Sequence, residues 1–181
     1  LGDWRISSRE FGDPINPRIF HETEELLHQL FSARALIKEM KDEGIKKIIE
    51  FLLWEIKLCE EWGNARPEEG GEHFLAYAIE KIRPARYLHG ALIALNVLIV
   101  LRLQGSDAIF NYQDVQDVLD CIGLKYSPQS LGIPREDFKK ALEYVPKYVV
   151  EEKLFHGLWN RLNPFQEVSI EKILDWIYSF K

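Results

Sequence analysis

Two histidines, His73 and His89, hold matching positions in the chain, each close to glycine at a predicted loop-to-helix border. They are separated by 89 − 73 = 16 residues, which is enough for one short helix and a connection. Neutral imidazole is a common ligand of zinc, iron and nickel. The pair is therefore either two arms of a metal site or two polar residues at exposed helix ends. A catalytic metal site usually takes three protein ligands, so the pair alone is one ligand short.

Charged residues next to this pair allow similar alternatives. Glu68, Glu69 and Glu72 could support a metal or form a solvated acidic loop. The guanidinium of Arg66 could bind a substrate phosphate, whose geometry it suits, or make a structural salt bridge. The remaining histidines are isolated, and we interpret them as surface or helix-end residues; they are His21, His28 and His156.

Helical spacing of apolar residues runs through most of the chain and predicts the elements that position these side chains. No sustained polar/apolar alternation indicates a strand, so we expect an all-α fold with seven or eight helices. Helices are predicted over residues 21–44, 45–62, 72–82, 89–104, 111–123, 134–145, 149–162 and 168–180. The single domain, residues 1–181, divides into an N-terminal arm (1–20), two long helices (21–62), the candidate metal-site helices (63–104) and C-terminal helices (105–181).

Two of these segments carry specific expectations. Two prolines and a glycine in "FGDPINPR" predict a loop or arm for residues 1–20. The helix over 45–62 has an apolar stripe that we expect to face the core, formed by Ile48, Ile49, Leu52, Leu53, Ile56 and Cys59.

Composition and charge exclude several classes of function. The chain is 46% hydrophobic and 29% charged, which is typical of a folded domain, and its net charge of −6 with no basic cluster argues against nucleic-acid binding. The apolar run 91–101 is too short to cross a bilayer, so we expect a buried helix and no membrane partner. Two cysteines far apart suggest no disulfide framework and a cytoplasmic protein. Phosphate-binding glycine motifs such as G-x-G-x-x-G do not occur.

The stretch "GNARPEEGGEHFLAYAIE", followed by "YLHG", resembles the helical C-terminal domain of glycerol-1-phosphate dehydrogenases. These belong to the iron-containing alcohol dehydrogenase and dehydroquinate synthase-like superfamily. The family has a Gly-Ser-Ser-Arg-Pro-like loop, then Ser-Glu-His at a helix start, then a Leu-His-Gly turn. This chain keeps, in order, Gly63, Arg66, Pro67, Glu72, His73, Leu88, His89 and Gly90. Asp3-Trp4 and Leu131-Gly132-Ile133 extend the resemblance over residues 3–148.

The resemblance implies a divalent metal, zinc or iron, held by one aspartate and two histidines that map to His73 and His89. The metal would polarise a substrate hydroxyl, NAD(P) would accept the hydride, and Arg66 would help hold a phosphorylated substrate. The family's aspartate lies upstream of its Asp-Trp pair, outside this sequence. The same is true of its nucleotide-binding domain. We therefore expect NAD(P) to bind only with a nucleotide-binding domain or chain from elsewhere, and no hydride transfer by this chain alone.

Departures from the family pattern lie close to the candidate site. Ala91 follows His89-Gly90 where the family usually has glutamate, and Tyr77 stands where it often has a further histidine. One hypothesis is a fragment or separately encoded piece of a polyol dehydrogenase; a first residue other than Met also suggests a fragment, a processed product or a trimmed chain. The other is a stand-alone binding or assembly module that has lost the chemistry. Either way, apolar surface left without a nucleotide domain predicts a homo-oligomer.

Overall fold

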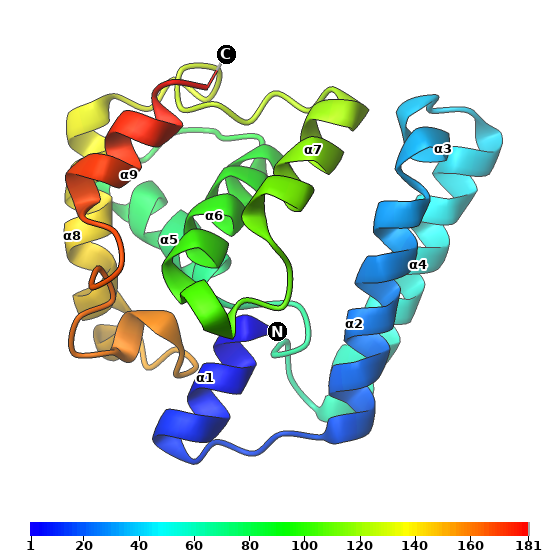
Figure 1. Cartoon of the computed structure of the whole chain (residues 1–181), viewed down its shortest axis with the longest axis horizontal. Helices are drawn as coiled ribbons and strands as arrows, with labels where there is room; N and C mark the ends of the chain where they lie inside the picture. The colour runs from blue at the N-terminus through cyan, green and yellow to red at the C-terminus, as the bar shows by residue number, and fades with distance from the viewer. Residues whose placement is uncertain (181) are drawn as a thin grey trace.

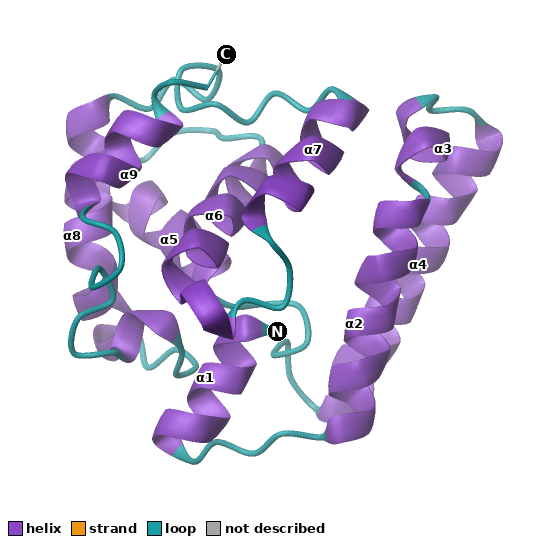
Figure 2. Ribbon diagram, in the orientation of Figure 1, coloured by secondary structure: helices purple, strands orange, loops and turns teal. Residues whose placement is uncertain are grey.

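The computed structural model describes residues 1–180, and these fold into helices joined by loops and turns (Figure 2). The described residues contain no strand, so the prediction of an all-α fold is confirmed. Their α-helices number nine, eight of them with seven residues or more: one predicted helix divides, the N-terminal segment adds another, and the helix predicted over 149–162 does not form as a separate element. The elements are α1 (Gly2–Phe11), α2 (Pro17–Ser32), α3 (Arg34–Lys38), α4 (Asp42–Trp62), α5 (Gly71–Ile82), α6 (His89–Gln104), η1 (Gly105–Asp107), α7 (Tyr112–Ile122), α8 (Arg135–Glu151), η2 (Leu158–Asn160) and α9 (Ile170–Ile177).

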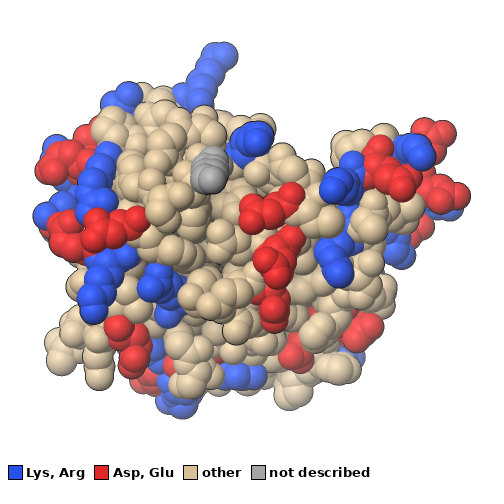
Figure 3. All heavy atoms as spheres, turned by 45° about the horizontal axis from the view of Figure 1, so that its top comes forward, with Lys and Arg blue, Asp and Glu red and all other residues tan. Residues whose placement is uncertain are grey.

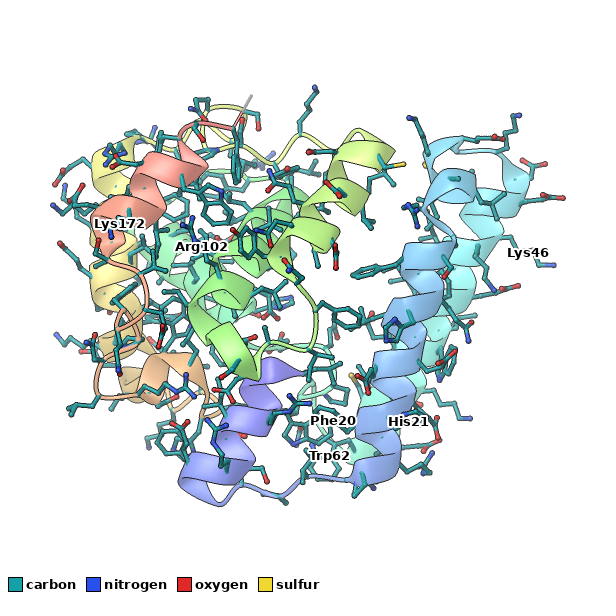
Figure 4. All side chains as sticks on the ribbon, in the orientation of Figure 1. Phe20, His21, Lys46, Trp62, Arg102 and Lys172 are labelled. Carbon is teal, nitrogen blue, oxygen red and sulfur yellow. The ribbon has the colours of Figure 1, made fainter. Side chains whose placement is uncertain are left out.

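Helix α6 is the centre of the core. It packs against α5 and α7, and α8 packs on α5 (Figure 1). The segment His89–Asp107 is long and apolar enough to span a membrane, with a mean hydropathy of 1.3. However, 56% of that window is buried by neighbouring helices, which is the pattern of a core helix. Its last turn places Arg102, which is labelled in Figure 4, over the ring of Trp176, and the ring centroid is 4.5 Å from the guanidinium carbon.

The prediction of a loop or arm over residues 1–20 is wrong for its first half, which forms α1. Trp4 and Ile6 are buried, so tertiary packing stabilises a helix whose sequence offers little helical signal. Gly12 ends the helix in the left-handed conformation. The prolines do mark a boundary, since Pro17 is the first residue of α2 and Asn16 caps it through its side chain.

Helices α2, α3 and α4 form a hairpin that lies beside the body of the molecule (Figure 1). The helix predicted over 21–44 divides at Ala33 into α2 and α3. At its base the hairpin is fixed by Trp4, which packs between Phe20 and Trp62 with ring centroids 5.9 Å and 5.0 Å away (Figure 4). At its other end α3 packs on α7. The hairpin is therefore joined to the body at both ends.

Between these two contacts runs an apolar groove of about 370 Å³, and the surface is visibly hollowed beside the hairpin (Figure 3). Leu27, Leu30 and Phe31 of α2 line one side of the groove. Val97 of α6 and Leu119 of α7 line the other side. The carboxylate-bearing residues Glu55, Glu68 and Glu72 also line it.

The prediction that the α4 stripe faces the core is wrong for most of its members. The apolar side chains of α4 that are buried are those of Phe51 and Leu58, which pack into the clusters that join α4 to α2. Ile45, Ile49, Leu52, Leu53 and Ile56 lie on the outer side and are between 43% and 62% exposed. The helix carries apolar residues on two faces, and α2 covers only one of them.

The prediction of a helix over 149–162 is also wrong beyond Glu151, where α8 ends. Lys153 has a positive φ of 54°, which a continuing helix does not allow. The chain then turns so that Trp159, in η2, is buried against the start of α5. The predicted helices at 72–82 and 89–104 match α5 and α6 to within one residue.

Candidate metal centre

The structure brings His73 and His89 together. His73 lies in the first turn of α5 and His89 is the first residue of α6, so the connection between these packed helices returns the chain to the same place. The centroids of the two imidazole rings are 5.6 Å apart and their planes are inclined by 47°. The His73 side chain is 12% exposed, whereas His89 is exposed. The two side chains therefore lie close together, which the 16-residue spacing allows.

Glu72 orients the His73 ring. Nδ1 of His73 lies 3.0 Å from Oε1 of Glu72, and the same oxygen accepts a hydrogen bond of 2.8 Å from the backbone nitrogen of Gly70. Burial by itself would raise the pKa of Glu72 and lower that of His73, but their hydrogen bond and the opposite charges around them together outweigh burial, so the pKa of Glu72 is lowered and that of His73 is raised. A carboxylate on one ring nitrogen leaves Nε2 as the nitrogen that could bind a metal, as is common for metal-binding histidines.

Contacts from distant parts of the chain hold this first turn of α5. The side-chain nitrogen of the fully buried Asn96 donates a hydrogen bond of 3.1 Å to the carbonyl of Glu72. The indole nitrogen of Trp159 donates to the carbonyl of Gly71 at 2.8 Å. A Cβ atom at Gly71 would lie 2.8 Å from Oδ2 of Asp3, so only glycine fits this helix start. The backbone beneath the histidine pair is therefore positioned from α6, η2 and α1.

Asp3, in the Asp-Trp pair, is a structural residue. Its Oδ1 accepts hydrogen bonds from Nε2 of Gln104 at 2.8 Å and from the backbone nitrogen of Leu158 at 3.2 Å. Burial raises the pKa of this carboxyl group, although the charge of Arg66 acts in the opposite direction. Asp3 therefore links α1 to the end of α6 and to η2.

No third ligand joins the two histidines among residues 1–180, where no group of three His, Cys, Asp or Glu side chains is arranged to hold a metal. Tyr77 lies on the same helix with its ring centroid 6.2 Å from that of His73, and its hydroxyl donates to Oε1 of Glu69 at 2.9 Å. Glu68 is exposed and Ala91 is buried. The residues of this chain therefore fit two positions of a three-ligand site.

Arg66 is buried beneath α1, where it makes several contacts. Its Nη2 donates to Oγ of Ser7 at 3.0 Å and to the backbone carbonyl of His156 at 2.7 Å, and its guanidinium lies over Phe155. Its Nη1 has no hydrogen-bond partner among the described residues. Arg66 lines a small cavity of about 290 Å³ with residues that include Asp13. Half of the guanidinium is thus committed to structural bonds, and the role of Arg66 as a phosphate contact stays a prediction.

Glu55 was not identified from the sequence. It lines the apolar groove from α4, and burial, with the nearby charge of Glu68, raises its pKa to about 7. The signal was a single carboxylate inside the apolar run "FLLWEIKL". Recognising Glu55 as a groove residue requires knowing which side of α4 faces the groove, and the sequence does not give this.

A helical body that pairs two histidines at the starts of consecutive helices has the arrangement that the dehydroquinate synthase-like resemblance implied. The chain is homologous to one part of the glycerol-1-phosphate dehydrogenases, which confirms the resemblance. It is 28% identical over 134 residues to the glycerol-1-phosphate dehydrogenase (NAD(P)+) of Methanosphaerula palustris, covering 74% of this chain and 36% of that protein. For the proteins of the same name from Methanoculleus marisnigri and Sulfurisphaera tokodaii, the identity is 29% and 32%, covering 77% and 64% of this chain and 38% and 31% of theirs.

The chain therefore spans less than two fifths of the length of these relatives. No protein-family model matches it. Homology to part of an NAD(P)+-dependent dehydrogenase is what these comparisons establish.

Proposed function

We propose that this chain is the metal-holding helical part of an NAD(P)-dependent dehydrogenase that acts on a polyol of the glycerol 1-phosphate type. The observation that supports this most directly is the approach of His73 and His89 to a ring distance of 5.6 Å, with Glu72 bonded to Nδ1 of His73. Two separate helix starts meet here, and the polar support for one of them comes from three other elements. Surface histidines that only cap helices do not require such support.

In this proposal His73 and His89 supply two nitrogen ligands to zinc or iron. A third ligand, the aspartate that the resemblance implies, comes from outside this sequence, together with the site for NAD(P). When bound, the metal acts as a Lewis acid on a substrate hydroxyl. The contribution of this chain is to hold two imidazoles at a fixed separation on α5 and α6, the best-packed helices of the fold.

Metal binding tests the proposal in two settings. With two ligands, the purified chain is expected to bind zinc weakly. Either His73→Ala or His89→Ala should abolish that binding. The control is His21→Ala, which replaces an exposed histidine of α2 and should leave the binding unchanged. Joined behind the corresponding N-terminal part of the Methanosphaerula palustris relative, the chain should retain zinc or iron near one per chain after dialysis. A folded chimera that holds no metal would contradict the proposal.

A second candidate function is a binding or assembly module that has kept the fold and lost the chemistry. It is favoured by the absence of a third ligand among residues 1–180 and by Tyr77, whose hydroxyl is bonded to Glu69. This alternative predicts that the chimera stays free of metal and that the chain self-associates. Tight, histidine-dependent metal binding by a strictly monomeric chain would exclude it.

A further inference from the structure

We propose that the outer face of α4 is a self-association surface, on which a second copy of this chain packs its own α4 in antiparallel orientation. The face consists of Ile45, Ile49, Leu52, Leu53 and Ile56, which we call the α4 outer stripe. All five are large apolar residues, and each is at least 43% exposed. An apolar patch of this size on a folded domain marks an interaction site more often than a solvated surface.

The spacing of the stripe is that of a helix-packing seam. Ile45, Ile49, Leu52 and Ile56 are separated by four, three and four residues. This is the alternation by which one α-helix meets another along its length. The half-buried Cys59 continues the pattern by a further three residues. The seam lies opposite Phe51 and Leu58, so using it does not disturb the packing of α4 in the hairpin.

Charges beside the stripe identify the partner as another α4 and fix its direction. Lys46 lies seven residues before Leu53, and Glu60 lies seven residues after it. A two-fold axis through Leu53 therefore places Lys46 of each copy opposite Glu60 of the other. Both residues are exposed, and neither makes an ion pair within the part of the chain that the structure describes. Figure 4 shows Lys46 pointing away from the body of the molecule.

A second pair of opposite charges lies near Leu53, three residues before it and four residues after it, which is one residue off the symmetry of the first pair. Glu50 and Lys57 are exposed, carry opposite charges and lie on either side of Leu53. In the isolated chain they make only exposed ion pairs, with Lys47 at 3.0 Å and Glu61 at 3.7 Å. Such pairs are weak and exchange readily. Glu50 and Lys57 can therefore adjust to a second α4, while Lys46 and Glu60 set the antiparallel register.

A parallel pair of α4 helices would bring like charges together. In a parallel pair, Lys46 lies level with Lys46 of the other copy and Glu60 with Glu60, so neither of these exposed charges meets its opposite. Repulsion of this kind disfavours an alternative helix pairing as effectively as attraction favours the correct one. The charge pattern thus selects the antiparallel orientation.

The mass of the 181-residue chain in solution tests the surface. Sedimentation equilibrium across a range of concentrations should show a dimer, and Leu53→Glu should raise its dissociation constant by at least about tenfold, since it places two carboxylates at the two-fold axis. The matched control is Val150→Glu on α8, which replaces a residue of similar exposure (66%) outside the stripe and should leave the dimer unchanged. Circular dichroism checks that each variant is folded. A chain that stays monomeric at all concentrations would overturn the proposal and assign the stripe to a different protein. A dimer insensitive to Leu53→Glu would also overturn it, and would assign the association to a different face.

A charge exchange tests the orientation. Lys46→Glu alone and Glu60→Lys alone should each weaken the dimer, by roughly tenfold for two symmetric contacts. The double variant Lys46→Glu, Glu60→Lys should restore it, because each reversed charge again meets its opposite. Single variants without effect, or a double variant that stays weak, would overturn the antiparallel register.

Discussion

Gly44 and Leu36 are in contact through their backbones: a Cβ atom at Gly44 would lie 2.5 Å from the carbonyl oxygen of Leu36. Gly44 is in the first turn of α4 and Leu36 is in α3, so this contact closes the outer end of the hairpin. A backbone oxygen cannot move aside as the end of a flexible side chain can. The close approach of α3 to α4 therefore requires glycine at this position.

Gly44→Ala should destabilise the protein by about 1–3 kcal/mol, because the added methyl group separates α3 from α4. Gly90→Ala is the matched control, since Gly90 is in the first turn of α6 and a Cβ there meets nothing within 4 Å. It should stabilise by about 0.5–1 kcal/mol through helix propensity. Urea denaturation measures both, and equal effects of the two substitutions would contradict the close contact at Gly44.

Glu72→Gln should weaken metal binding in the chimera with the N-terminal part of a relative. The amide lacks the charge that holds Nδ1 of His73, and loss of such an outer carboxylate typically costs 10–100-fold in metal affinity. Competition with a chelator of known affinity measures the change. Glu80→Gln, further along α5, is the control and should have no effect. Unchanged affinity in Glu72→Gln would show that the carboxylate of Glu72 does not support a metal on His73.

Glu55 should make stability fall as pH rises. Its pKa is about 7 in the folded protein against 4.5 for an unperturbed glutamate, so between these values the folded state holds a proton that the unfolded state has lost. Glu55→Gln removes this difference. Relative to wild type, the variant should gain about 1–2 kcal/mol between pH 5 and pH 8, a figure reduced for the partial exposure of the carboxyl group.

Urea denaturation at the two pH values, with chelator present, measures this gain. Glu143→Gln on α8 replaces an exposed carboxylate and should follow the wild-type pH profile. If Glu55→Gln also followed it, the carboxyl group of Glu55 would be solvated rather than held in the groove.

Asp107 should show the opposite pH dependence. It accepts hydrogen bonds from Arg9 and, at 2.6 Å, from Arg161, and these interactions hold its pKa below the usual value. Its stabilising effect is complete above the unfolded pKa and is lost as pH falls through the lower, folded value. Asp107→Asn should therefore cost about 1–2 kcal/mol at neutral pH and less below about pH 4. Asp114→Asn, an exposed site on α7, should cost little at either pH.

Part of this fold follows from local sequence signals. Helices α5 and α6 are predictable because glycine and proline bound their patterns, and the spacing of the two helix starts allows His73 and His89 to meet without requiring it. The role of α1 was not predictable, since Trp4 and Ile6 form a helix only by packing against elements distant in sequence.

The orientation of α4 could not be predicted for a different reason. Its apolar residues lie on two faces, so periodicity alone does not decide whether Phe51 and Leu58 or the α4 outer stripe is buried. Arg66 is similar, because its burial depends on Ser7 and His156, which are 59 and 90 residues away. Which face of α4 is buried, and whether Arg66 is buried, depend on tertiary contacts rather than on local spacing.

The hairpin of α2, α3 and α4 is held at its base by Trp4 and at its tip by the packing of α3 on α7. A helical hairpin that is fixed at both ends bends far less than one that is fixed at a single end. A molecule that binds along α4 therefore meets a surface already in its final shape. Little conformational freedom is lost on contact, and more of the energy of apolar burial remains as affinity.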